Sequence, residues 1–299
     1  MIFIHNHSTL PPETASSLAD VIRAQEEAGC TIVTDGFYSA RDPVWLAIEC
    51  VGGVEPGTPA DYFGASFSVP TPVVRDHLHY QAAAAVERWR AAQSETERPV
   101  KAVLPGPLTL ALLSDYARSP YHDRESLAEA WATALLPEFT ALVAAGAKWI
   151  QLDEPAILRM PDAVRLLRDL LQPFWDSREH ATLLVSTWGA ETEEMYAQLH
   201  SLPTDIIGVD VVMSPNLLDL IPEVGASQQL YLGVISPVAK NRCDDLSVKI
   251  ERILHNYEFP DLHLGPAAGL QSLEPRAAID ALREIYALGR RLSPPHPTP

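Results

Sequence analysis

The chain has 299 residues, 47% of them hydrophobic, so it can bury the core of one large domain without disulfides or structural metals. Its 39 acidic and 22 basic residues give a net charge of -17, and a surface of this sign repels phosphate backbones and anionic lipids. Nucleic acids and membrane surfaces are therefore excluded as expected partners, and a small-molecule substrate is expected instead.

The cysteines and the amino terminus predict a cytoplasmic protein. Cys30, Cys50 and Cys243 lie far apart and form no Cys-x-x-Cys pair, which predicts neither a disulfide framework nor a thiolate metal cluster. The segment from Met1 to His7 lacks the features of a secretory signal. We also expect no apolar run of the roughly 18 residues that span a bilayer.

Eight short apolar runs predict eight buried strands. The segments between them show helical spacing and end in glycine, as from Leu18 to Gly29 and from Leu135 to Gly146. This alternation predicts one (β/α)8 TIM barrel over residues 1–292, rather than a doubly wound sheet, because no glycine-rich phosphate turn follows the first run. The expected strands are Ile2–His5, Thr31–Thr34, Lys101–Leu104, Trp149–Asp153, Thr182–Ser186, Ile206–Asp210, Leu230–Val234 and Leu262–Gly265.

Two segments depart from this repeat. Residues 51–98 form an insertion that we expect to cap the barrel mouth, with a helix from His77 to Ala92. Residues 293–299 are too rich in proline to continue a helix, so they predict a frayed tail.

The carboxyl ends of the strands supply the candidate catalytic residues, because barrel enzymes place their active sites at that face. Asp153 and Glu154 are adjacent carboxylates at one strand end, where a carboxylate can bind an amine or act as a base. We assign catalysis to Asp153. Glu154 either binds the substrate or caps the helix that Pro155 begins.

The first strand ends in two histidines that project to the same side. His5 and His7 either ligate a divalent metal or hydrogen-bond a ligand and neighbouring carboxylates, and we favour the second interpretation. His7 is assigned a catalytic role, and His5 and Asn6 are assigned to substrate binding. No metal ligand is assigned.

Further candidates follow the second, fifth and sixth strands. Asp35 and Asp210 are predicted to be catalytic. Arg41 can clamp a carboxylate or pair with a neighbouring aspartate, and Trp188 can form a flat apolar wall or pack in the core. The residues of this group assigned to substrate binding are Tyr38, Arg41, Ser186 and Trp188.

Four segments together resemble the carboxyl-terminal catalytic domain of cobalamin-independent methionine synthase and its short single-barrel relatives. They are Gln25 to Gly36, Pro105 to Thr109, Gln151 to Ala156 and Gly265 to Leu270. The resemblance implies the same barrel and a methyl transfer from a methyltetrahydrofolate polyglutamate to the thiolate of homocysteine, which a zinc ion activates. A folate co-substrate is accordingly implied, and no other cofactor is assigned.

The matched positions depart from the zinc site that the resemblance implies. Where the family has His, Cys, Glu and Cys as ligands, this chain has Ser186, Trp188, Asp210 and Ala268. Phe37 replaces a glutamate that binds the homocysteine amine, and the Asp-x-His after the seventh strand is missing from Gly233 to Pro237. Asp153 is retained as half of the amine site, whereas no thiolate ligand remains.

These departures predict a divergent, methyltransferase-like enzyme that acts on a small amine- or thiol-bearing substrate without the zinc site. Two alternatives stay open. One is a hydrolase or lyase with a new metal site made of His5, His7, Asp153 and Asp210, and the other is a folate- or amino-acid-binding protein without catalysis. A uroporphyrinogen decarboxylase-like barrel is disfavoured, because few basic residues lie at strand ends. Homodimer formation is left open.

Overall fold

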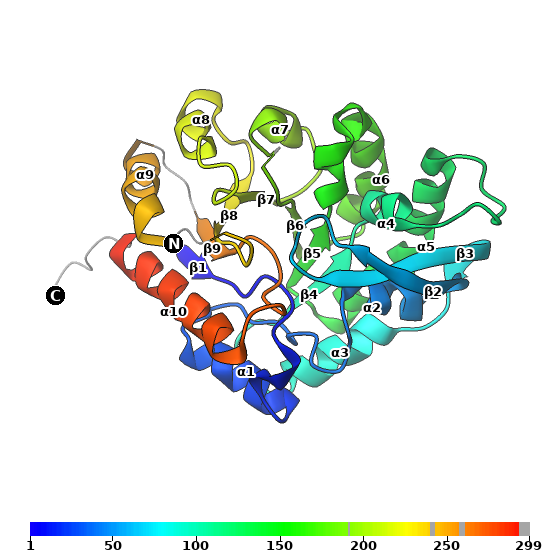
Figure 1. Ribbon diagram of the computed structural model, residues 1–299, viewed down its shortest axis with the longest axis horizontal. Helices are drawn as coiled ribbons and strands as arrows, with labels where there is room; N and C mark the ends of the chain where they lie inside the picture. Colours follow the sequence, from blue (N-terminus) through cyan, green and yellow to red (C-terminus); the bar gives the residue numbers. More distant parts are fainter. Residues whose placement is uncertain (191, 240–242, 257–260, 293–299) are drawn as a thin grey trace.

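A curved sheet of seven parallel strands forms the centre of the computed structural model, which describes residues 1–190, 192–239, 243–256 and 261–292 (Figure 1). Every neighbouring pair in this sheet is parallel, as continuous apolar strands covered by helices require. In spatial order the strands are β1 (Ile2–Ile4), β9 (Leu262–Pro266), β8 (Gln229–Ile235), β7 (Ile206–Asp210), β6 (Thr182–Ser186), β5 (Trp149–Asp153) and β4 (Lys101–Pro105).

Residues 31–34 close this sheet into a barrel between β1 and β4. His5 bridges Ile32 on one side, and Val33 bridges Val100 on the other, both in parallel. The backbone N–H of Ile32 donates to the carbonyl of Ile4 (3.1 Å), and the N–H of Lys101 donates to the carbonyl of Val33 (2.8 Å). The expected (β/α)8 barrel is therefore confirmed, with a second strand reduced to single bridges.

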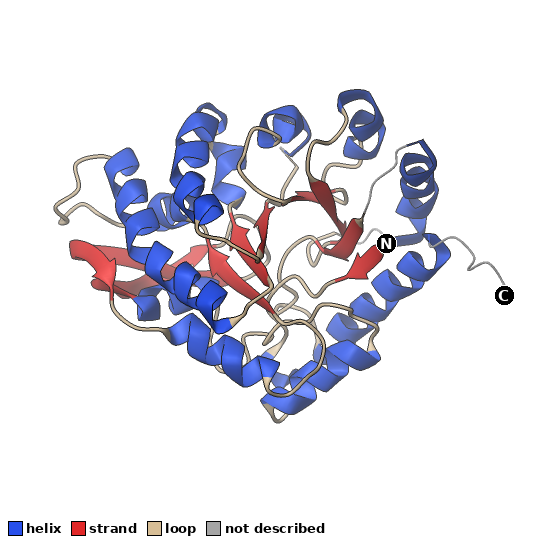
Figure 2. Ribbon diagram, turned by 180° about the vertical axis from the view of Figure 1, so that it is seen from behind, coloured by secondary structure: helices blue, strands red, loops and turns tan. Residues whose placement is uncertain are grey.

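Helices surround the sheet on its outer side (Figure 2). The side chain of Ser17 caps the first helix by accepting from the N–H of Asp20, and α5 ends at Gly146 with a left-handed φ of 98°. The helices are α1 (Leu18–Glu27), α2 (Pro43–Cys50), α3 (Ala84–Gln93), α4 (Pro107–Leu113), α5 (Arg124–Ala145), α6 (Val164–Asp176), α7 (Thr192–Leu199), α8 (Leu217–Val224), α9 (Cys243–Asn256) and α10 (Pro275–Leu292), with short 3-10 turns η1 (Pro12–Thr14), η2 (Pro155–Arg159) and η3 (Pro161–Ala163).

Helix α5 is long and apolar enough to cross a membrane by length and composition, contrary to the expectation from the sequence. In the folded chain, 56% of its most apolar stretch is buried. It packs against α4, α6 and β3, with Leu135 and Phe139 fully enclosed. The apolar side chains of α5 therefore pack in the core between the barrel strands and the surrounding helices.

The apolar core lies mainly between the sheet and the helices, and a smaller apolar group lies inside the barrel. That inner group comprises Leu184, Ile206 and Tyr231, with Trp149 packed against them. Other side chains enclosed in the barrel are polar or charged, among them His5, Lys101 and Gln151. The interior thus differs from the layers of branched apolar side chains usual in such barrels.

The insertion is an antiparallel ribbon of β2 (Val51–Asp61) and β3 (Ser68–Tyr80), followed by α3 (Figure 1). The expected helix from His77 to Ala92 was wrong over its first part, because β3 continues to Tyr80, which pairs with Val51. The ribbon tip reaches the barrel mouth, where the indole of Trp188 donates to the carbonyl of Phe63 (3.2 Å). The expected proline-rich tail lies outside the described residues.

Substituting the glycines that follow two helices distinguishes the cost of a left-handed backbone from the cost of a steric clash. Gly29 (φ 97°) and Gly146 (φ 98°) both adopt left-handed backbone. No described atom lies within 4 Å of a Cβ built at Gly146, whereas a Cβ at Gly29 overlaps the Tyr286 ring. We expect Gly146→Ala to lower the free energy of unfolding by about 1 kcal/mol, and Gly29→Ala to lower it clearly further, as measured by urea denaturation. Equal losses in the two variants would contradict this assignment.

Candidate functional site

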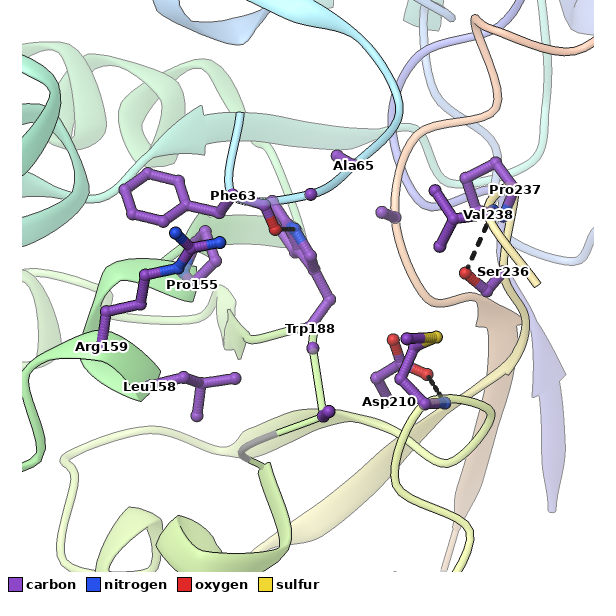
Figure 3. A pocket seen from close by; sticks show the side chains of 15 residues that line it. Phe63, Ala65, Pro155, Leu158, Arg159, Trp188, Asp210, Ser236, Pro237 and Val238 are labelled. Carbon is purple, nitrogen blue, oxygen red and sulfur yellow. Dashed lines mark hydrogen bonds between the residues drawn. The ribbon is translucent and has the colours of Figure 1, made fainter. Parts of the chain in front are cut away.

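A pocket of about 210 Å³ opens at the carboxyl ends of the strands (Figure 3). It lies between the ribbon tip and the loops that follow β5 to β9, which is the face where barrels of this class place their sites. Its lining residues are Phe63, Gly64, Ala65, Pro155, Leu158, Arg159, Trp188, Gly189, Ala190, Asp210, Met213, Ser236, Pro237, Val238 and Ala268.

Asp210 is the carboxylate in this lining. Its Oδ1 accepts hydrogen bonds from the backbone N–H groups of Val212 (3.0 Å) and Met213 (2.9 Å), which fix the side chain at the end of β7. Burial raises the pKa of Asp210 to about 6. Asp210 is therefore a fixed acid whose charge changes just below neutral pH.

Trp188 contacts both the pocket and the barrel interior. Its ring lies 5.4 Å from Tyr62 of the ribbon and 5.5 Å, edge-on, from the imidazole of His7. Together with the hydrogen bond to Phe63, these contacts leave Trp188 only 4% exposed. Trp188 therefore lines the pocket and also packs in the core, and its role in substrate binding stays a prediction.

Asp153 lies at the end of β5 and is fully enclosed. Its Oδ1 accepts from the amide Nε2 of Gln151 (2.7 Å) and lies 3.8 Å from Nε2 of His7. Its Oδ2 has no hydrogen-bond partner among the described atoms. Burial raises the pKa of Asp153 to about 7. The Oδ2 atom of the ionised Asp153 can therefore accept a hydrogen bond from a ligand.

The hydrogen bonds of His7 fit a neutral imidazole. Its Nε2 lies 3.1 Å from the Ser186 hydroxyl and 3.2 Å from Nε2 of Gln151, both of which can donate. Its Nδ1 lies 3.0 Å from the Ser8 hydroxyl, which places the proton on Nδ1. Burial and the charge of Lys101 lower the pKa of His7 well below its usual value.

His5 and Asn6 do not face the pocket. Nε2 of His5 lies 2.9 Å from Nδ1 of His263, and the His5 ring packs edge-on against Trp149 and Tyr231. The amide of Asn6 donates to the Thr34 hydroxyl (2.9 Å), which joins β1 to the closing strand. These contacts bury His5 in the barrel interior and tie Asn6 to the closing strand.

Glu154 caps a neighbouring helix. Its carboxylate accepts from the N–H of Leu108 (3.1 Å), the N–H of Thr109 (2.8 Å) and the Thr109 hydroxyl (2.7 Å), at the start of α4. Burial raises the pKa of Glu154 to about 7. Of the two predicted roles the structure favours capping, but of α4 rather than of the η2 turn that Pro155 begins.

Asp35, Tyr38 and Arg41 lie apart from the pocket that Asp210 lines. Asp35 accepts from the N–H of Phe37 (3.1 Å) in a tight turn, and the Tyr38 hydroxyl donates to the carbonyl of Ser16 (2.7 Å). The guanidinium of Arg41 lies 4.3 Å from the centre of a Trp45 ring. Tyr38 and Arg41 border a separate hollow of about 420 Å³, so the predicted site residues form two groups.

The positions that match the zinc ligands do not fit a zinc ion. The Ser186 hydroxyl is bonded to His7, the Trp188 indole donates to Phe63, and Ala268 offers no side-chain donor. Within the described ranges, no group of three or more His, Cys, Asp and Glu side chains is placed to hold a metal. The alternative metal site is not assembled either, because His5 faces His263 instead of Asp210.

Sequence reasoning missed the part played by Lys101, Gln151, Tyr62 and His263 in this interior. Lys101 is buried at the start of β4 and donates to Oε1 of Gln151 (2.5 Å). The alternation of side chains along a strand could have predicted the position of Gln151. Residues two apart face the same side, so Gln151 lies on the same face as Asp153. Polar residues on the inward face of otherwise apolar strands mark the whole network.

Comparisons with known proteins agree with this architecture. A family model described as "Cobalamin-independent synthase, N-terminal domain" matches residues 62–253. Curated 5-methyltetrahydropteroyltriglutamate–homocysteine methyltransferases from Herpetosiphon aurantiacus and Thermosynechococcus vestitus are 28% and 26% identical, over 89% and 90% of this chain. The chain spans only 37% of the length of each of these relatives.

Solved structures show the same fold. A B12-independent methionine synthase from Shewanella sp. W3-18-1, in complex with selenomethionine, superposes with a TM-score of 0.80 at 20% identity and covers 97% of both chains. A methyltransferase from Methanosarcina mazei gives 0.71 at 16% identity, covering 97% of this chain and 93% of its own. The family model and the four sequence segments therefore indicate the same family. They indicate different domains of it, because the model describes the amino-terminal domain and the segments resemble the carboxyl-terminal one.

The capping role of Glu154 has a measurable consequence for stability. Glu154→Ala leaves the first N–H groups of α4 buried without an acceptor, so we expect the free energy of unfolding to fall by about 2 to 3 kcal/mol. Glu129→Ala, at an exposed position of α5, is the matched control and should change it by less than about 0.5 kcal/mol. Urea denaturation measures both; similar losses in the two variants would refute the capping role.

Proposed function

Because the chain belongs to the cobalamin-independent methionine synthase family, we propose that it is a divergent, methyltransferase-like enzyme for a small amine- or thiol-bearing molecule, working at the barrel mouth without a zinc site. The observation that carries the proposal is the unpartnered Oδ2 of Asp153. A buried carboxylate oxygen without a donor is costly, and an ammonium group of a ligand removes that cost.

The composition of the pocket supports a small ligand with one polar and one apolar part. Trp188 and Phe63 present aromatic surface, whereas Asp210 presents a carboxylate. An amino acid fits this combination, with its ammonium directed to Asp153 and its side chain against the aromatic wall. Trp188 and the ribbon tip must move for the ligand to reach Asp153, since Asp153 has no exposed surface.

Asp210 is the proposed acid-base group. In a methyl transfer to a thiol, a sulfur–carbon bond forms, the bond from carbon to the departing nitrogen breaks, and the thiol proton must move to that nitrogen. In this proposal Asp210 accepts this proton and returns it, and its pKa of about 6, which leaves it mostly ionised at neutral pH, supports that role. The methyl donor in this proposal is a reduced folate, as in the names of the curated relatives.

A second candidate is a binding protein that retains the amine site without turnover. The absence of a thiolate at Ser186, Trp188 and Ala268 favours it, because the activated nucleophile of the family's reaction then lacks its metal. Both candidates place the ligand in the same pocket, so they differ only in whether a product forms. Mass spectrometry after incubation with homocysteine and methyltetrahydrofolate separates them.

The proposal extends to location and partners. Cys30 and Cys50 are buried free thiols, and burial raises the pKa of each to about 12, which suits a reducing cytoplasm. A small molecule is the proposed partner, rather than nucleic acid or membrane. A homodimer stays a prediction for measurement in solution.

Calorimetric titration with L-methionine and L-homocysteine tests the amine site. We expect Asp153→Asn to abolish binding, because the amide keeps the shape of the side chain but loses its charge, and to lower the melting temperature, because the buried Lys101 loses its balancing anion. Asp162→Asn, at an exposed position of η3, is the control and should bind as the unaltered protein does. Full affinity in Asp153→Asn, or no binding of either amino acid to the unaltered protein, would rule out this site.

The affinity for L-methionine should depend on pH through the two aspartates. The pKa values of Asp210 and Asp153 are raised to about 6 and about 7, so both are protonated at pH 5 and ionise as the pH rises. Affinity for the ammonium should therefore rise between pH 5 and pH 8 in two steps. Asp210→Asn should remove the lower step only; an unchanged profile in this variant would exclude Asp210 from the site.

A further inference from the structure

Lys101 brings a positive charge into the closed interior of the barrel. The residue is 1% exposed, and burial lowers its pKa to about 7. Its Nζ donates to Oε1 of Gln151 (2.5 Å) and lies 5.4 Å from the centre of the Tyr231 ring. The proposed reaction does not use this group, so its burial calls for another reason.

The hydrogen bonds from Lys101 to Asp153 can run in one direction only. An ammonium donates and cannot accept, so Gln151 must turn its Oε1 toward Lys101. The amide nitrogen of Gln151 then points the other way and donates to Oδ1 of Asp153 (2.7 Å). Lys101 thereby determines which Asp153 oxygen is an acceptor and leaves Oδ2 free.

Asp153 is the anion in this interior that balances Lys101. Burial lowers the pKa values of His5, His7 and His263, and it raises those of Cys30, Tyr62 and Tyr231, so all six are neutral near pH 7. The attraction between Lys101 and Asp153 is felt by both groups, favouring the charged form of each. The titratable groups that face this pair are these six and Glu154, a buried carboxyl group that interacts with Asp153 and whose pKa is raised to about 7.

We propose that Lys101 is a positioning residue, which acts through the Gln151 amide to keep Asp153 ionised, with Oδ1 held as an acceptor and Oδ2 presented to the ligand. This inference rests on the proposed amine site at Asp153. It adds that the ability of Asp153 to bind an ammonium depends on a second cation, located deeper in the barrel, that never contacts the ligand.

Carbon-13 NMR of the aspartate carboxyl groups tests the proposal on the ligand-free protein. The Asp153 signal is the one missing from Asp153→Asn. In Lys101→Met the midpoint of its titration should rise by about one pH unit or more, because the nearby cation is lost. Lys148→Met, at an exposed position before β5, should leave the midpoint unchanged. An unchanged or lowered midpoint in Lys101→Met overturns the proposal.

Gln151→Met distinguishes the effect of the Gln151 hydrogen bond on Asp153 from the direct effect of the Lys101 charge. It keeps Lys101 but removes the amide that donates to Asp153, so the midpoint should again rise and the affinity for L-methionine at pH 7 should fall about tenfold. If Lys101→Met does not fold, the Gln151→Met variant alone tests the proposal. An unchanged Asp153 midpoint in Gln151→Met then refutes the role of the Gln151 amide. A raised midpoint combined with no methionine binding in the unaltered protein overturns the amine site but not the positioning of the carboxylate.

Discussion

The burial of charged and polar groups inside the barrel is the constraint on which the structure depends. An isolated charge there is strongly disfavoured, so each charged group needs a partner that is also enclosed. Lys101 and Asp153 satisfy each other through Gln151, across the neighbouring strands β4 and β5. A shift of either strand by one residue would turn one of these side chains outward, toward the helices.

The chain separates its large apolar core from its buried polar side chains. The large apolar core lies between sheet and helices, where Leu135, Phe139 and their neighbours are packed, whereas the barrel interior holds the polar network. Asp153 and Asp210 then differ through their surroundings. One is sealed beneath the mouth, and the other borders an open pocket while backbone N–H groups fix its orientation.

The strands could be predicted from sequence because each is a short apolar run between turn signals, and Gly29 and Gly146 end helices where the helical spacing ends. The ribbon could not, because its pairing joins Val51 to Tyr80 across nearly thirty residues. Strand ends also suggested one site for Asp35, Arg41, Asp153 and Asp210. The directions of the loops divide these residues, and the direction of a loop depends on contacts that sequence periodicity does not encode.

The β2–β3 ribbon has a further consequence, for how copies of this chain meet. Pro56 faces Pro72 and Pro59 faces Pro70 across the ribbon, and proline has no N–H to offer to an added strand. An open strand edge would otherwise invite edge-to-edge pairing between molecules, which leads to aggregation. The edge of β3 is in addition covered where Val73 bridges Asp115, so the prolines and this bridge together remove backbone N–H groups with which another molecule could pair.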